Sequence, residues 1–134
     1  MKKLTIDSSV IIASLLEKEP RHQEASQIWN SIVTGNNVAI MPYSVFVEVV
    51  AAIKRRTGSE ELALDVKQTL LNIDNVSFVV LDQKTAEAAA DLAARMGLRG
   101  MDALVVQTAK EFDGELVTFD GEMTKRAELV LKNT

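Results

Sequence analysis

Short apolar runs alternate along the chain with longer stretches in which apolar residues recur every three or four positions. The short runs predict four strands, over 4–6, 38–41, 76–81 and 116–119. The helical spacing predicts helices over 10–16, 25–32, 44–56, 62–73, 82–97, 101–112 and 123–131. Because strands separated by helices need crossover connections, the pattern predicts α/β architecture. We expect one domain over residues 1–134, with a small parallel sheet of four or five strands and helices on both faces.

The segment 44–56 is apolar on nearly every side, which predicts a helix in the core. Glu48 interrupts it, in the sequence Val45-Phe46-Val47-Glu48-Val49-Val50. An unpaired buried carboxylate costs several kcal/mol, so Glu48 should be exposed, paired with a cation such as Arg99, or bound to a metal ion. The apolar neighbours make exposure the least favoured of these readings.

Three further acids lie in comparable places. Asp7 follows the first predicted strand, Asp120 follows the fourth, and Asp102 lies in the first turn of an otherwise apolar helix. The carboxyl ends of parallel strands meet at one edge of a sheet, so Asp7 and Asp120 should lie on the same side of the molecule. The alternative is that each of the three stabilises the start of a helix, by capping or through the helix dipole.

Composition decides what four converging carboxylates could hold. The chain has no Cys and one His, and its 19 acidic against 15 basic residues give a net charge of −4. Converging carboxylates need protons or cations, and an oxygen-only set favours Mg²⁺ or Mn²⁺. Such an ion suits phosphodiester hydrolysis, and it would let an acidic protein bind a polyanion without a basic surface.

The four acidic segments also resemble those of the PIN-domain nucleases, and within them the VapC-type toxins. The matching segments are Ile6-Asp7-Ser8-Ser9-Val10-Ile11-Ile12, Val47-Glu48-Val49, Met101-Asp102-Ala103-Leu104 and Val117-Thr118-Phe119-Asp120. The resemblance implies an endoribonuclease acting on single-stranded or looped RNA with Mg²⁺ or Mn²⁺. It also implies a homodimer restrained by a cognate antitoxin.

Carried over residue by residue, the resemblance makes Asp7 and Asp102 the metal ligands. Glu48 and Asp120 would complete the catalytic acidic pocket, directly or through water, and Ser9 and Thr118 would orient a carboxylate or water. Two alternatives stay open. One is a catalytically silent RNA-binding or scaffold PIN domain. The other is a metal-dependent DNase, which the small size of the chain disfavours.

Other residues are expected to have structural roles. Asp82 should cap the following helix, His22 has no catalytic neighbour, and basic residues such as Lys125 and Arg126 should be solvated helix ends. The helices that contain Trp29 and 66–70 are candidates for a dimer interface. No targeting segment or membrane span is predicted, so we expect a cytoplasmic protein.

Overall fold

A four-stranded parallel sheet forms the centre of the molecule in a computed structural model, which describes residues 1–131. The strands are β1 (Lys3–Ile6), β2 (Val38–Pro42), β3 (Val76–Val79) and β4 (Glu115–Val117), in the order β3-β2-β1-β4. All neighbouring strands pair in parallel, with Leu4 of β1 opposite both Ala39 and Glu115. The predicted α/β class and parallel sheet are confirmed. The predicted domain 1–134 ends in residues 132–134, which lie outside the described residues.

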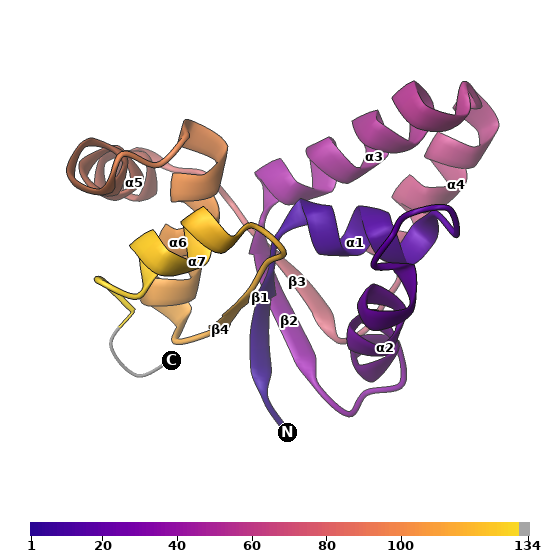
Figure 1. Cartoon of the computed structure of the whole chain (residues 1–134), viewed down its shortest axis with the longest axis horizontal. Helices are drawn as coiled ribbons and strands as arrows, with labels where there is room; N and C mark the ends of the chain where they lie inside the picture. Colours follow the sequence, from indigo (N-terminus) through magenta and orange to yellow (C-terminus); the bar gives the residue numbers. More distant parts are fainter. Residues whose placement is uncertain (132–134) are drawn as a thin grey trace.

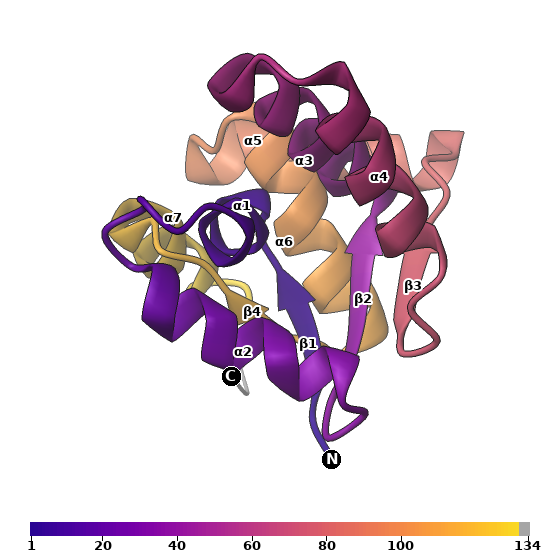
Figure 2. The same cartoon turned by 90° about the vertical axis from the view of Figure 1, so that its right-hand side faces the viewer.

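Seven helices connect and follow the strands within the described part of the chain. They are α1 (Ser8–Leu15), α2 (His22–Val33), α3 (Tyr43–Thr57), α4 (Glu60–Leu71), α5 (Gln83–Met96), α6 (Gly100–Phe112) and α7 (Gly121–Ala127). Figure 1 shows α5, α6 and α7 on one side of the sheet and α2 and α4 on the other. The view turned by 90° in Figure 2 shows α2 in front of the sheet and α6 behind it. Helices therefore cover both faces, as predicted. No helix within residues 1–131 has the length and apolar character needed to cross a membrane.

The core lies between the sheet and these helices. Ile6 of β1, Ile11 of α1, Met41 of β2 and Val106 of α6 are all fully buried in it. Trp29, Val66 and Leu70 are buried in the same core. Their side chains are therefore not available to a dimer interface, although the outer faces of α2 and α4 are.

Helix α3 differs from its prediction. Val45 and Val49 are buried, but Val47 is 61% exposed, so the expectation of a helix buried on nearly every side is wrong. The helix packs with one face on α1 and α4, and its other face is open to solvent. Its start also differs slightly, because Pro42 ends β2 and the helix begins at Tyr43.

Helix α5 begins and ends with the expected signals. The Asp82 carboxylate accepts a hydrogen bond from the backbone N–H of Thr85 at 2.8 Å, which confirms its role as a helix cap. This hydrogen bond lowers the pKa of Asp82 below its ordinary value. At the other end, Gly97 adopts a left-handed conformation (φ 67°) that ends the helix and turns the chain toward α6.

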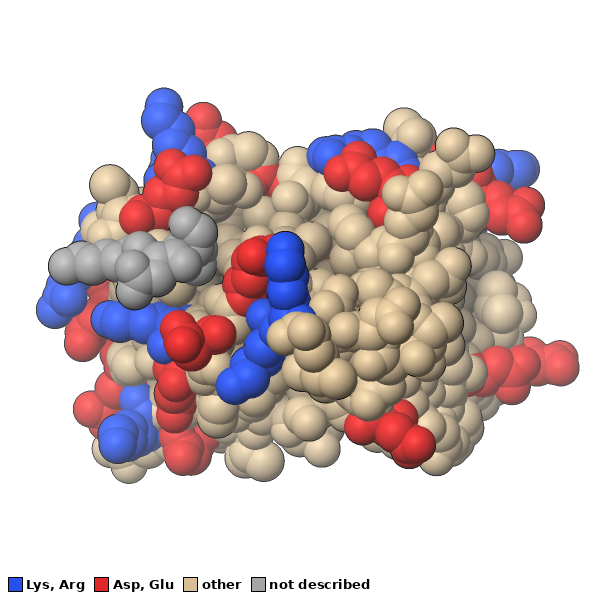
Figure 3. Space-filling view, turned by 90° about the horizontal axis from the view of Figure 1, so that it is seen from below, with Lys and Arg blue, Asp and Glu red and all other residues tan. Residues whose placement is uncertain are grey.

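The surface at the amino-terminal ends of the strands is shown in Figure 3. Positive and negative side chains are interspersed on one half of this face, and the half toward α2 is largely uncharged. Helix α2 itself contains one acidic residue, Glu24, and no Lys or Arg. The described residues on this face form no continuous basic surface for a polyanion.

Candidate acidic site

Asp7 lies where β1 leads into α1, and its carboxylate is held by hydroxyl groups rather than by the helix. The residue occupies the N-cap position of α1 but makes no side-chain capping hydrogen bond, and it is only 7% exposed. Its Oδ2 accepts hydrogen bonds from Ser9 Oγ at 2.8 Å and from Thr118 Oγ1 at 3.0 Å. The alternative of a helix cap therefore does not explain Asp7. Two hydroxyls fix one carboxylate oxygen, and Oδ1 receives no hydrogen bond from a described residue.

Glu48 projects from the second turn of α3 toward the start of α1. Its Oε1 accepts a hydrogen bond from Ser8 Oγ at 3.2 Å, and the side chain is half-buried. None of the ion pairs within residues 1–131 joins Glu48 to Arg99, so the structural ion pair considered from the sequence is not formed. Sequence reasoning missed Ser8. Its position between Asp7 and Ser9 was the available signal.

Asp102 lies in the first turn of α6 and is half-buried. Burial raises the pKa of Asp102 above its ordinary value, and the negative charges of Asp7, Asp120 and Glu48 raise it further. The nearby Arg99 guanidinium acts in the opposite direction but more weakly. The structure therefore brings all four predicted carboxylates into one electrostatic neighbourhood, with Asp102 acted on by the other three.

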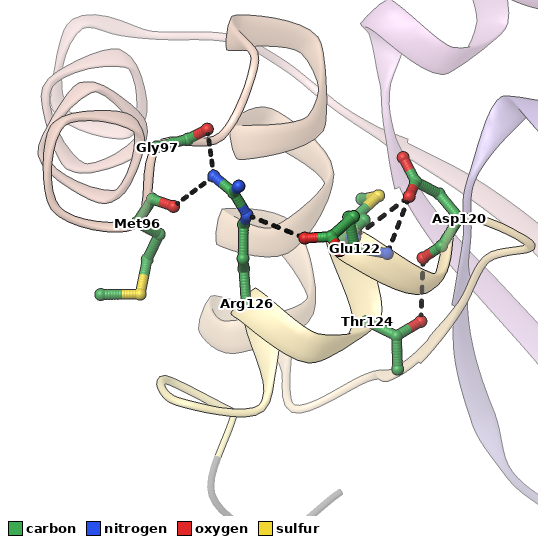
Figure 4. Close-up of polar contacts among 7 residues, drawn as sticks. Met96, Gly97, Asp120, Glu122, Thr124 and Arg126 are labelled. Carbon is green, nitrogen blue, oxygen red and sulfur yellow. Dashed lines mark hydrogen bonds and ion pairs between the residues drawn. The ribbon is translucent and has the colours of Figure 1, made fainter.

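Asp120 has a second role that the sequence left open. Its Oδ1 accepts hydrogen bonds from the backbone N–H groups of Glu122 at 3.0 Å and Met123 at 3.2 Å, so it caps α7 (Figure 4). Strand β4 ends at Val117 rather than at residue 119, which leaves two residues before Asp120. One of them, Thr118, accepts a hydrogen bond from the Asp120 N–H at 3.1 Å. The Thr118 hydroxyl thus connects Asp120 to Asp7.

Two hollows in the surface meet at Asp102. One, of about 600 Å³, lies between α5 and α6 and is also lined by Glu48 and Arg99. The other, of about 400 Å³, lies between the α5–α6 turn and α7 and is lined by Asp120, Arg126 and again Arg99. The hollows open Asp102 to solvent from two sides, with Glu48 in one and Asp120 in the other, whereas Asp7 lines neither.

The donor chemistry of the site fits a hard divalent cation that keeps bound water. All its ligating groups are carboxylate and hydroxyl oxygens, which Mg²⁺ and Mn²⁺ prefer. Among residues 1–131, no three acidic or histidine side chains lie close enough together to hold one ion as a group. A cation here would contact one or two carboxylates directly and reach the others through water, which is the usual arrangement for Mg²⁺.

Comparison with known proteins is consistent with this geometry. The family model described as PIN domain matches residues 4–129. The structure is similar to the crystal structure of VapC20 from Mycobacterium tuberculosis, a toxin that cleaves the sarcin–ricin loop. The TM-score is 0.78 at 20% sequence identity, over 92% of this chain and 94% of that one. No curated protein matches the chain in sequence. At this level of identity the likeness to VapC20 concerns the fold.

Proposed function

The chain belongs to the PIN-domain family, and from this membership we propose that it is an endoribonuclease that uses Mg²⁺ or Mn²⁺ to hydrolyse phosphodiester bonds of RNA. The observation that carries the proposal is the arrangement of the carboxylates around the start of α1, where Asp7 and Glu48 are held by hydroxyl groups. Burial, and then the charges of Asp7, Asp120 and Glu48, raise the pKa of Asp102 beside them. Like charges kept together in this way favour a bound cation, and perturbed carboxylates in a surface hollow are typical of functional sites.

Each residue has a defined part in this proposal. Asp7 and Asp102 hold the ion, and the hydroxyls of Ser9 and Thr118 orient Asp7 so that Oδ1 faces the ligand. Glu48 and Asp120 would accept hydrogen bonds from water around the ion. A divalent ion held there would supply Lewis-acid activation of the phosphate and of the attacking water.

We further propose that the protein is the toxin of a cytoplasmic toxin–antitoxin pair, with single-stranded or looped RNA as substrate. The sequence resemblance to VapC-type toxins and the likeness in fold to VapC20 support this. The cleavage of the sarcin–ricin loop by VapC20 makes RNA loops the first substrates to test. A small antitoxin encoded by the neighbouring gene should copurify with the chain and inhibit cleavage.

A homodimer is the oligomeric state that we propose. Apolar side chains lie open to solvent in the single chain, at Val47 of α3 and at Val80 and Leu81 after β3. Light scattering on the purified protein should give twice the mass of the chain. A monomer at micromolar concentration would contradict this part of the proposal.

The test of the function is RNA cleavage in Mg²⁺ or Mn²⁺ by the wild type and by Asp7→Asn and Asp102→Asn. Asp65→Asn is the matched control, because it removes the same charge from an exposed position on α4. Cleavage should be lost in the two site variants and kept in the control. Equal cleavage by all four proteins would identify a contaminant and contradict the proposal.

Two parallel measurements separate the alternatives. Digesting DNA beside RNA identifies a DNase. Calorimetric titration with Mn²⁺ identifies a silent RNA-binding or scaffold domain, which would bind RNA without needing a stoichiometric ion at Asp7 and Asp102.

A further inference from the structure

Arg126 ties α7 to the turn between α5 and α6. Its Nη1 donates hydrogen bonds to the carbonyl oxygens of Met96 at 3.0 Å and Gly97 at 2.8 Å (Figure 4). Its Nε lies 3.7 Å from Glu122 Oε2. The carbonyls at the end of a helix have no partners within the helix, so a guanidinium that binds them is well placed both sterically and electrostatically. Arg126 is therefore not the solvated helix end that the sequence suggested.

Arg126 is the one residue of α7 whose side chain makes hydrogen bonds to another element within the described residues. The helix spans only Gly121–Ala127 and packs lightly on the rest of the described chain. Two of its side chains, Met123 and Ala127, are buried. The Asp120 cap lies within the helix's own first turn and so does not attach α7 to other elements.

The two elements that Arg126 joins carry two of the four carboxylates. The turn after Gly97 leads within three residues into α6, whose first turn contains Asp102. Helix α7 begins directly after Asp120. Arg126 lines the same hollow of about 400 Å³ as Asp102 and Asp120, between the turn and the helix. Helix α6 is firmly packed on the sheet, so a change at Arg126 would move α7 rather than α6.

We propose that Arg126 is a positioning residue that sets the place of Asp120 relative to Asp102 by docking α7 on the α5–α6 turn. The proposal deepens the proposed function, on which its metal-binding and cleavage readouts rest. Arg126 acts here through Asp120 and not by contacting RNA or the ion.

The chain offers a matched control in the adjacent residue. Lys125 is exposed on the same helix, carries the same charge and makes no hydrogen bond or ion pair with a described residue. Arg126→Ala and Lys125→Ala thus remove the same charge from nearly the same place, and only the first removes the link to Met96 and Gly97. We expect Arg126→Ala to weaken Mn²⁺ binding in calorimetry by about 10-fold, as the loss of a group just outside the direct ligands does, because it displaces Asp120. We expect Lys125→Ala to stay within about 2-fold of the wild type, since exposed charges are screened.

A double-mutant cycle tests whether the effect passes through Asp120. Asp120→Asn keeps a good helix-capping side chain and removes the carboxylate. If Arg126 works by placing that carboxylate, Arg126→Ala should have almost no further effect on Mn²⁺ affinity or on kcat for RNA cleavage in the Asp120→Asn background. An undiminished effect in that background would mean that Arg126 acts independently, and would overturn the proposal. An equal loss in Lys125→Ala would overturn it as well.

Amide hydrogen exchange keeps the proposal testable even if the chain neither binds Mn²⁺ nor cleaves RNA. In that case the proposed function fails, but the docking of α7 can still be measured. The Glu122 and Met123 amides should exchange several-fold faster in Arg126→Ala than in the wild type or Lys125→Ala. Partial restoration is expected in Arg126→Lys, which can still donate to one of the two carbonyls. Unchanged exchange in Arg126→Ala would show that Arg126 does not hold α7.

Discussion

Replacing Asp102 by Asn should stabilise the metal-free protein at neutral pH. Burial and the charges of Asp7, Asp120 and Glu48 raise the pKa of Asp102 above its ordinary value of 3.8, so its ionised form is disfavoured in the folded state. Asparagine has almost the same shape and no charge. The substitution therefore removes repulsion at little cost in packing.

Burial is the largest cause of this shift, and the charges around Asp102 add a contribution that can be counted pair by pair. Three carboxylates repel it and one guanidinium attracts it, which leaves a net excess of two repulsive pairs. Because Asp102 is only half-buried, each pair is screened by solvent and contributes about 0.2–1 kcal/mol. The expected gain in the free energy of unfolding is about 1 kcal/mol, or a rise in Tm of about 3–5 °C for a domain of this size.

The pH dependence of the stability difference between Asp102→Asn and the wild type tests the predicted stabilisation a second time. A carboxyl group whose pKa is higher in the folded than in the unfolded state destabilises the folded state at pH values above the folded pKa. Below the unfolded pKa the group is protonated in both states, and this destabilisation is lost. The advantage of Asp102→Asn should be full at pH 7 and should shrink as the pH falls toward 4. Urea unfolding in EDTA at several pH values measures it, with Asp65→Asn as the control for a charge removed elsewhere. A variant less stable than the wild type at pH 7, or an advantage that does not shrink in acid, would show that the ionised Asp102 carboxylate does not destabilise the folded protein.

Three further predictions concern the ion and two threonines. In a thermal-shift assay, saturating Mg²⁺ should raise the Tm of the wild type and leave the Tm of Asp102→Asn almost unchanged, because an ion that binds only the folded state stabilises it. Equal shifts in both proteins would mean that the ion binds at another site. Thr118→Val removes the donor to Asp7 at 3.0 Å and the acceptor of the Asp120 N–H. RNA cleavage should fall about 10-fold with the fold intact by circular dichroism, and unchanged cleavage would show that the hydroxyl does not orient Asp7. Thr5 is fully buried in β1, and its hydroxyl has no hydrogen-bond partner among the described residues. Thr5→Val should therefore raise the free energy of unfolding in urea by about 1 kcal/mol, and a loss would indicate an ordered water at this position.

The elements of the fold could be predicted well because their signals are local. The apolar run before Asp7 and the cap at Asp82 each depend on a few neighbouring residues, and the structure has both where the sequence placed them. The exposure of Val47 could not be predicted. A helix with apolar residues on every side does not reveal which face packs on its neighbours, and only the positions of α1 and α4 decide it.

The candidate site divides in the same way. The order of strands and helices is enough to predict that Asp7 and Asp120 lie at one edge of a parallel sheet. Glu48 and Asp102 can be recognised because each is an acidic residue within an otherwise apolar segment. The contacts that refine the site come from distant parts of the chain. Thr118 reaches Asp7 across 111 positions, and Arg126 binds carbonyls 29 and 30 positions earlier. No local pattern encodes such pairs, and they depend on how the finished elements pack.

The position of β1 between β2 and β4 has a consequence for synthesis of the protein on the ribosome. Asp7 emerges well before β4, the strand that pairs beside it, and before Thr118, one of the two hydroxyl residues that hold its carboxylate. Domains generally fold as units, so this carboxylate waits for the 111 positions up to Thr118 to be synthesised. The acidic site is thus completed only after β4 and Thr118 have been synthesised, and a shorter nascent chain carries Asp7 without them.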